Sequence, residues 1–368
     1  MSDLFSRLSR RRFLVSAGIS AVGAIALKGC TSPSASTDSP ATAVSPIAAT
    51  DEAALYEAAK KEGRLVVYSV FFTQDILNEI GAAFTAKYPG ITFEGTRNTA
   101  SDLFQKITQE IQAGLKVTDV FGTTDIGQML ELRKQNQLLQ FEPADKSAVV
   151  EAYRNLDPEN YYQPGAYIPL IIAYNSQRIG AADLPKSWKD LTLDKYKDAI
   201  ATGSGAASGQ VGTWALAMQN LYGWDDYFGK FNALNPKLGR SINDVMPVLV
   251  SGERALGIST LGQALHRKAK GDPIEVVYPE EGAVVVVGPY GILKNSPHPH
   301  AARLFLNFLM GEEYSNLVAK HYEQPLRSNI TIPNGKTISE MKTISLKPDE
   351  IQKGLPDIVS KWRNKFGA

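Results

Sequence analysis

Three consecutive segments of the chain share one layout, in which an apolar run of strand length leads into apolar residues at helical spacing. The strand-like runs are RLVVYSVFF (64–72), ITFEGTRN (91–98) and TDVFGTT (118–124). After the first run, apolar residues between Ile76 and Phe84 recur on one helix face until Tyr88-Pro89-Gly90 ends the pattern. The alternation of strand and helix predicts a parallel, doubly wound α/β sheet.

The residues that follow these strands are expected to share one edge of the sheet. In a parallel sheet every strand-to-helix turn lies at that edge, where helix amino termini present free N–H groups. Thr99, with Asp102 three residues later, has the spacing of an amino-terminal helix cap. The rim residues predicted for ligand contact are Phe71, Phe72, Thr73, Arg97, Asn98, Thr123 and Thr124.

A second set of strand-helix units follows the apolar strand YIPLIIAYN (167–175). DAIATGSGAASG (198–209) is a strand with a Gly/Ser turn, and its helix is expected over 210–221. GERALGIST (252–260) is a strand whose Thr260 is expected to cap a helix through Lys270. The rim and hinge residues predicted for ligand contact in this set are Ser204, Gly205, Ser208, Thr260, Tyr167 and Tyr322.

These patterns predict an α/β chain of two doubly wound lobes joined by two crossing strands, near 167–175 and 276–287. The first lobe is expected to hold residues 51–168 and about 283–315. The second lobe is expected to hold 169–282 and about 316–368, and two helices are expected over 300–310 and 312–320.

The amino terminus has the pattern of an export signal. Ser9-Arg10-Arg11-Arg12-Phe13-Leu14 resembles a twin-arginine motif, and the apolar run that follows is too short to span a bilayer. Residues 1–29 are therefore predicted to be a twin-arginine-type signal peptide. Leu27-Lys28-Gly29-Cys30 resembles a lipobox, with Lys28 as a departure from it, so lipid attachment is expected at Cys30. A plain cleaved signal is the alternative, and 30–50, rich in Ser, Thr, Ala and Pro, is expected to be a flexible tether.

Composition and motifs argue against several other classes of protein. Beyond residue 29 the chain has 34 basic and 37 acidic side chains, so it lacks the excess of positive charge that nucleic-acid binding requires. NGKT (334–337) lacks the upstream glycine of a phosphate-binding loop, because that position is Ile330. No residues assemble a nucleophile with a base, and His298-Pro-His300 favours a turn over a metal pair. We therefore expect no catalysis, no cofactor and no metal site, with an exported enzyme as a less favoured alternative.

Three further stretches resemble a known family. They are LIIAYNSQRIGAADLPKSWKDLTLDKYKDAI (170–200), with Pro-x-Ser-Trp-x-Asp-Leu at 185–191, then GPYGILKNSPHPHAARLFLNFLMGEE (288–313) and YEQPLRSNI (322–330). The resemblance is to the ferric-iron-binding periplasmic proteins, of the type II periplasmic-binding fold, and it runs from about Leu65 to Ile330. It implies the solute-binding subunit of an ABC importer, a monomer that closes on a small-molecule solute and docks on a permease. It also implies a location in the periplasm or at the outer face of the cytoplasmic membrane.

The metal ligands of that family do not carry over to this sequence. Iron-binding members place a His or Tyr after the first strand and a Tyr-Tyr pair after a strand of the second lobe. Here those positions are Phe71-Phe72 and Thr260-Leu261, which offer no anionic oxygen to Fe(III). Tyr161, Tyr162, Tyr322 and Glu323 keep iron binding open as the alternative, should the metal use other positions.

The prediction is therefore a small organic solute held against an aromatic wall. Phe71 and Phe72 are expected to form that wall, although one of them can be a core residue because successive strand residues point to opposite faces. Arg97 is expected to contact an anionic group such as a carboxylate, sulfonate or phosphate, with a solvated surface arginine as the alternative. The hydroxyl residues can cap helices and contact the solute at the same time.

Overall fold

The computed structural model describes residues 48–367, which form one compact unit. The predicted signal peptide, Cys30 and all but the last three residues of the predicted tether lie outside the described residues.

Within residues 48–367, eleven strands form one continuous sheet with the main order β2-β1-β3-β10-β5-β8-β6-β7. The strands are β1 (Arg64–Ser69), β2 (Thr92–Arg97), β3 (Val120–Gly122), β4 (Leu138–Leu139), β5 (Tyr162–Asn175), β6 (Ile200–Thr202), β7 (Lys237–Leu238), β8 (Leu256–Thr260), β9 (Ile274–Val277), β10 (Ala283–Leu293) and β11 (Thr343–Ser345). Strands β1, β2 and β3 pair in parallel, as do β6, β7 and β8. Each of these two groups, with the helices that follow its strands, is one lobe, and the predicted two-lobed α/β architecture is confirmed.

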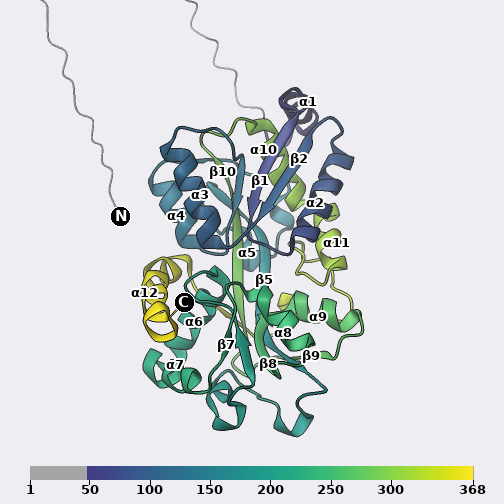
Figure 1. Ribbon diagram of the computed structural model, residues 1–368. Helices are drawn as coiled ribbons and strands as arrows, with labels where there is room; N and C mark the ends of the chain where they lie inside the picture. Colours follow the sequence, from purple (N-terminus) through teal and green to yellow (C-terminus); the bar gives the residue numbers. More distant parts are fainter. Residues whose placement is uncertain (1–47, 368) are drawn as a thin grey trace, which may run out of the picture. The chain divides into compact units, whose positions relative to one another are not determined.

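The two long strands β5 and β10 run together between the lobes (Figure 1). They pair with each other in the antiparallel sense, and β10 also pairs with β3 while β5 also pairs with β8. The second crossing strand was expected near 276–287, but that stretch divides into β9, which pairs with β5 beside β8, and β10, which begins at Ala283. A register shift between Gly288 and Pro289 interrupts the β5–β10 ladder, as expected for a proline that has no N–H to donate.

Twelve α-helices cover the sheet within the described residues (Figure 1). They are α1 (Glu52–Glu62), α2 (Gln74–Lys87), α3 (Ala100–Gln112), α4 (Ile126–Lys134), α5 (Glu151–Arg154), α6 (Gly209–Tyr222), α7 (Trp224–Ala233), α8 (Val245–Val250), α9 (Leu261–Ala269), α10 (Pro299–Met310), α11 (Glu312–Lys320) and α12 (Pro348–Phe366). No helix of residues 48–367 has both the length and the apolar character that a membrane span needs.

Helix starts follow the sequence closely. The hydroxyls of Thr73, Thr99 and Thr260 accept hydrogen bonds from N–H groups in the first turns of α2, α3 and α9. The strand TDVFGTT (118–124) predicts a following helix over about 126–138, and α4 begins at Ile126 as expected, with Asp125 as its cap. The helix ends earlier than expected, at Lys134, because Leu138 and Leu139 pair with β10 as β4.

Helix α12 packs against α4 of the first lobe and α6 of the second. Trp362 of this helix is fully buried and lies against Gly205, where a methyl group would come within 2.5 Å of the indole. The residue boundaries predicted for the two lobes, including the assignment of 316–368, stay a prediction.

Candidate functional site

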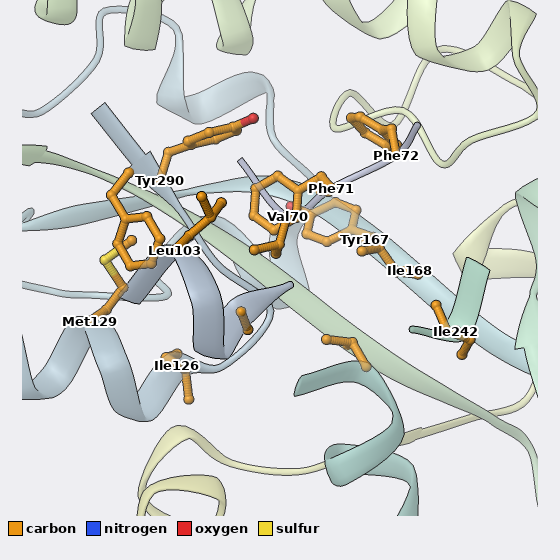
Figure 2. Close-up of a cluster of buried hydrophobic side chains, with 14 of the residues drawn as sticks. Val70, Phe71, Phe72, Leu103, Ile126, Met129, Tyr167, Ile168, Ile242 and Tyr290 are labelled. Atoms are coloured by element: carbon orange, nitrogen blue, oxygen red, sulfur yellow. The ribbon is translucent and has the colours of Figure 1, made fainter. Parts of the chain in front are cut away.

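The two phenylalanines after β1 lie in different surroundings. Phe72 adopts a left-handed backbone conformation with φ of 58°, which is rare for a bulky residue and costs conformational energy. The two rings are therefore turned apart, with their planes at 67° (Figure 2). Positive φ at a residue other than glycine, at the end of a strand, is often associated with a functional site.

Phe71 is a core residue and not part of a cleft wall. Its ring has no exposed surface and meets Tyr290 edge to face at 4.8 Å (Figure 2). Gly288 and Gly122 make room for it, since a methyl group at either position would lie within 3 Å of the ring. The prediction that both rings form a cleft wall is therefore wrong for Phe71, and only Phe72 can have that role. Phe71 is buried because Gly288, at the β-bulge in β10, leaves space for its ring in the core.

Phe72 lies where the lobes meet. It lines a small cavity of about 10 Å³ together with Thr260 and Gln210 of the second lobe. Asn243, also of the second lobe, donates a hydrogen bond of 3.5 Å to the Phe72 carbonyl and contacts Gln263. Groups from both lobes therefore converge on the turn after β1, as predicted.

Arg97 lies in an adjoining cavity at the end of β2. That cavity, also about 10 Å³, shares Val70 and Gln210 with the first and is lined by Asn98, Thr99, Thr124, Ser208 and Ser241 as well. The guanidinium donates a hydrogen bond of 3.3 Å to Ser241 Oγ across the lobes, while its Nε is buried without a partner among residues 48–367. Burial lowers the pKa of Arg97 below its ordinary value, and the nearby Asp244 carboxylate partly offsets this.

Direct contacts hold the lobes together around Arg97. Ser101 Oγ donates to the Ala207 carbonyl at 3.3 Å, and Arg240 forms an ion pair with Asp102. Gly209 at the start of α6 lies so close to Thr124 that a methyl group there would be 2.9 Å from Thr124 atoms. The structure thus describes lobes in contact, with little free volume at this end.

A larger cavity of about 410 Å³ opens beside the Phe72 cavity. Thr73, Asp75, Ile76 and Glu79 of the first lobe line one side, and Asn243, Met246, Pro247, Gly262, Gln263, His266, Arg267, Lys270, His321 and Glu323 line the rest. This volume is in the range of small-molecule sites. Because Asn243, Gln263 and Glu323 line both cavities, the two adjoin.

The structure brings together most of the predicted site residues. Those that line the three cavities just described are Phe72, Thr73, Arg97, Asn98, Thr124, Ser208 and Thr260. Gly205 lines a separate small cavity near α12.

The remaining predicted residues have other surroundings. Thr123 is fully buried and donates to Gln128, and Ser204 accepts from the Ala206 N–H within its own turn. Tyr167 is buried against Tyr153, with ring centroids 4.6 Å apart, and Tyr322 lies beside His266. None of these lines a cavity between the lobes.

Sequence reasoning missed Gln210, Ser241, Asn243 and Gln263, and it mentioned Glu323 only as a metal ligand. Gln210 and Gln263 lie in the first turns of α6 and α9, so a polar residue just inside a predicted helix was the available signal. Asn243 lies in a short 3-10 helix, Ile242–Asp244, and Ser241 directly precedes it. No apolar pattern in the sequence predicted this helix.

Metal-binding groups are scarce in these cavities. Within residues 48–367 no group of three or more His, Cys, Asp or Glu is placed to hold an ion, and no tyrosine lines the three cavities described above. The phenol of Tyr162, named above for the iron alternative, has a pKa raised to about 12 by burial and nearby Asp157. The geometry therefore favours a solute bound by hydrogen bonds and charge.

Comparison with known proteins identifies the family. A family model described as bacterial extracellular solute-binding protein matches residues 73–315, well over half of the chain. The chain belongs to this family. The family is one of binding proteins for transport and not of enzymes, and the resemblance predicted from the sequence is confirmed.

Individual proteins are similar to this chain in sequence or in fold. The spermidine/putrescine-binding periplasmic protein of Salmonella typhimurium is 26% identical over 265 residues, 64% of this chain and 70% of that protein. Iron-bound HitA from Pseudomonas aeruginosa has a TM-score of 0.71 and 22% identity, covering 82% of this chain and 99% of its own. AfuA from Actinobacillus pleuropneumoniae, solved with fructose-6-phosphate, has a TM-score of 0.74 and 22% identity, with coverage of 83% and 99%. At these identities the two structures support the fold alone.

Proposed function

We propose that the chain is the solute-binding subunit of an ABC importer and captures a small organic solute with an anionic group between its lobes. The solute enters while the lobes are apart, the strands β5 and β10 flex, and the closed form docks on a membrane permease. The chain works as a monomer and catalyses no reaction. Family membership supports the role, and the similarity to periplasmic binding proteins supports a site of action outside the cytoplasm.

The burial and incomplete hydrogen bonding of Arg97 are the observations that support an anionic group on the solute. A guanidinium that loses water on burial needs hydrogen-bond acceptors for its N–H groups. Ser241 supplies one acceptor from the other lobe, and Nε has none among the described residues. A carboxylate, sulfonate or phosphate on the solute would satisfy the remaining donors, most strongly in a forked contact.

The amino termini of α3 and α6 support the same choice. Thr99 and Ser208, which precede these helices, line the cavity beside Arg97. Free N–H groups and the helix dipole at each terminus favour negative charge there. The relatives bind polyamines, iron and a sugar phosphate by name, so their names do not decide the solute of this chain.

A thermal-shift screen of organic carboxylates, sulfonates and phosphates, followed by calorimetry on the hits, tests the proposal. A solute at about 100 times its dissociation constant adds about 2.7 kcal/mol to the free energy of unfolding. Arg97→Met should weaken the hits by about tenfold or more, as expected for loss of a charge-assisted hydrogen bond. Arg363→Met, which changes an exposed arginine of α12, is the matched control and should leave affinity unchanged. Hits that bind Arg97→Met as well as wild type would contradict the proposal.

Ferric citrate tests the iron alternative in the same preparation. Tyrosinate coordination of Fe(III) gives a visible charge-transfer band. We expect no such band, because no tyrosine lines the three inter-lobe cavities of the described residues. A band that saturates at one iron per protein would contradict the organic solute and would identify iron as the ligand.

We further propose that residues 1–29 direct export and that Cys30 carries the lipid anchor. The motif Leu27-Lys28-Gly29-Cys30 supports this, and the extracellular character of the family agrees with it. Cys30→Ala should release the protein from the membrane fraction without loss of export. An unchanged membrane fraction would contradict lipid attachment at this residue.

A further inference from the structure

Glu323 is a buried carboxylate between the large inter-lobe cavity and the small cavity of Phe72. It follows α11, is 5% exposed, and lines both the cavity of about 410 Å³ and the one that contains Phe72. Its carboxylate lies against the first turn of α9, where a methyl group on Gly262 would be 2.4–2.5 Å from the carboxylate atoms. Only glycine at position 262 lets the carboxylate occupy this place.

No group of the described protein satisfies this carboxylate. Other buried acids are well supplied, since Asp119 accepts from His298 and Ser296, Asp157 pairs with Arg133, and Glu110 accepts from Tyr68. For Glu323, no hydrogen bond or ion pair with residues 48–367 is formed. Burial alone raises its pKa to about 8. A buried carboxyl group without a hydrogen-bond partner is costly, so this exception requires an explanation.

The charged groups around the larger cavity do not neutralise Glu323. The titratable and charged side chains that face this space are Asp75 and Glu79 from α2, His266, Arg267 and Lys270 from α9 and its end, and His321 after α11, with Tyr314 of α11 packed behind. Arg267 pairs with Asp272 at 2.7 Å and His321 with Glu79 at 2.8 Å. Burial lowers the pKa of His266 below its ordinary value.

We propose that Glu323 receives a protonated nitrogen of the bound solute, so that the solute is an organic zwitterion with an amine at one end and an anionic group at the other. This inference rests on the proposed function, because Arg97 supplies the anion-binding end. Glu323 lines the larger cavity and the cavity of Phe72, Arg97 lines the third cavity, and the cavity of Phe72 shares lining residues with both of the others. An ammonium group of the solute would give Glu323 hydrogen-bond donors and a positive charge, neither of which the described protein residues supply.

Calorimetry with matched probes tests the amine. The probes are unbranched ω-amino acids from glycine to 6-aminohexanoate, the same acids without the amine, and the same amines without the acid. We expect at least one amino acid to bind about tenfold or more tightly than its amine-free counterpart. Glu323→Gln should remove that difference, and Glu57→Gln, a change at an exposed position of α1, should retain it.

The outcomes separate this inference from the proposed function. If no amine-bearing acid binds better than its amine-free counterpart, the amine site is wrong, and binding of the plain acid would leave the proposed function intact. If plain amines bind as tightly as the amino acids and Arg97→Met has no effect, the amine site stands and the anionic group proposed above is wrong.

Proton counting gives a second test that needs no variant. Titrations near pH 7 in buffers of different ionisation enthalpy report the protons released on binding. An ammonium group beside Glu323 would lower the raised pKa of the carboxylate, so binding should release close to one proton. Proton uptake, or no exchange, on binding of an amine-bearing probe would overturn the inference, because Glu323 would then stay protonated in the complex. Loss of the release in Glu323→Gln assigns it to this residue.

Discussion

Phe71 and Phe72 are adjacent and chemically identical, yet they belong to regions of opposite character. The first region, which we call the hinge core, consists of Phe71, Gly122, Gly288 and Tyr290. It is sealed, and its phenol is satisfied because the Tyr290 and Ser69 hydroxyls lie 2.8 Å apart. The second region, the inter-lobe surface, has Phe72, Arg97, Ser241, Thr260 and Glu323 around its cavities.

The difference between the two regions lies in unsatisfied polar groups. Both regions are buried, so burial alone does not separate structure from function. In the inter-lobe surface Arg97 Nε has no partner among residues 48–367, and burial is the sole cause of the raised pKa of Glu323, with no contribution from a hydrogen bond or a charge. Buried polar groups without a partner that line a cavity beside a strained residue such as Phe72 are features expected of a site for an external molecule.

Truncating the two rings should give the largest contrast. Phe71→Ala is expected to lower the free energy of unfolding by about 3–5 kcal/mol, because it leaves a cavity in a closed core. Phe72→Ala should cost only about 1–2 kcal/mol, because its ring already faces a cavity, but should weaken solute binding far more than Phe71→Ala does. Urea unfolding and calorimetry measure the two effects. Equal stability losses would remove the distinction between the regions.

Glu323→Gln should sharpen the contrast through pH. The folded-state pKa of Glu323 is raised from 4.5 to about 8, so wild type is most stable relative to the variant at low pH and loses that advantage as pH rises. Between about pH 5 and 8 the stability difference should shift toward the variant by on the order of 3 kcal/mol. Asp125, whose pKa burial raises to about 6, titrates in both proteins and cancels. A difference that is constant with pH would show that Glu323 is satisfied in the folded protein.

Gly288→Ala tests the hinge core from the opposite strand. The added methyl would lie 2.2–2.9 Å from the Phe71 ring, so overpacking should cost about 1–3 kcal/mol. Phe71→Leu in the same background should recover part of the loss, because the two residues share one space. Gly180→Ala, where nothing lies within 4 Å, is the matched control and should be nearly neutral. Additive effects of the two substitutions would contradict direct packing.

Arg240→Ala should have the smallest effect and should act on solute binding alone. Its ion pair with Asp102 joins the lobes but is exposed, so it is worth about 0.2–1 kcal/mol and weakens in about 1 M salt. Solute affinity should fall by about fivefold at most. Arg64→Ala breaks a comparable exposed pair, with Glu94, inside the first lobe and should leave affinity unchanged. Equal effects of the two variants would show that the Arg240 pair does not stabilise closure.

Much of the candidate site was predictable because it depends on strand ends and helix caps. Thr99 and Thr260 cap the helices that the sequence assigned to them. Arg97, Thr124 and Ser208 meet where parallel-sheet geometry places strand-to-helix turns. Asn243 and Ser241 could not be found in this way, because their short helix has no periodic apolar pattern and gains its position from contacts with the first lobe.

The sequence alone determined the alternation of strands and helices, the helix caps and the family resemblance, since each depends on residues a few positions apart. Only the tertiary structure decided which of two neighbouring phenylalanines is core and which acid has no partner. Those outcomes depend on Gly288, Gly122 and Gly262, which lie far along the chain from the side chains they accommodate. The burial of a side chain and the partners of its polar atoms depend on contacts between segments far apart in the sequence, and these contacts form only when the chain is folded.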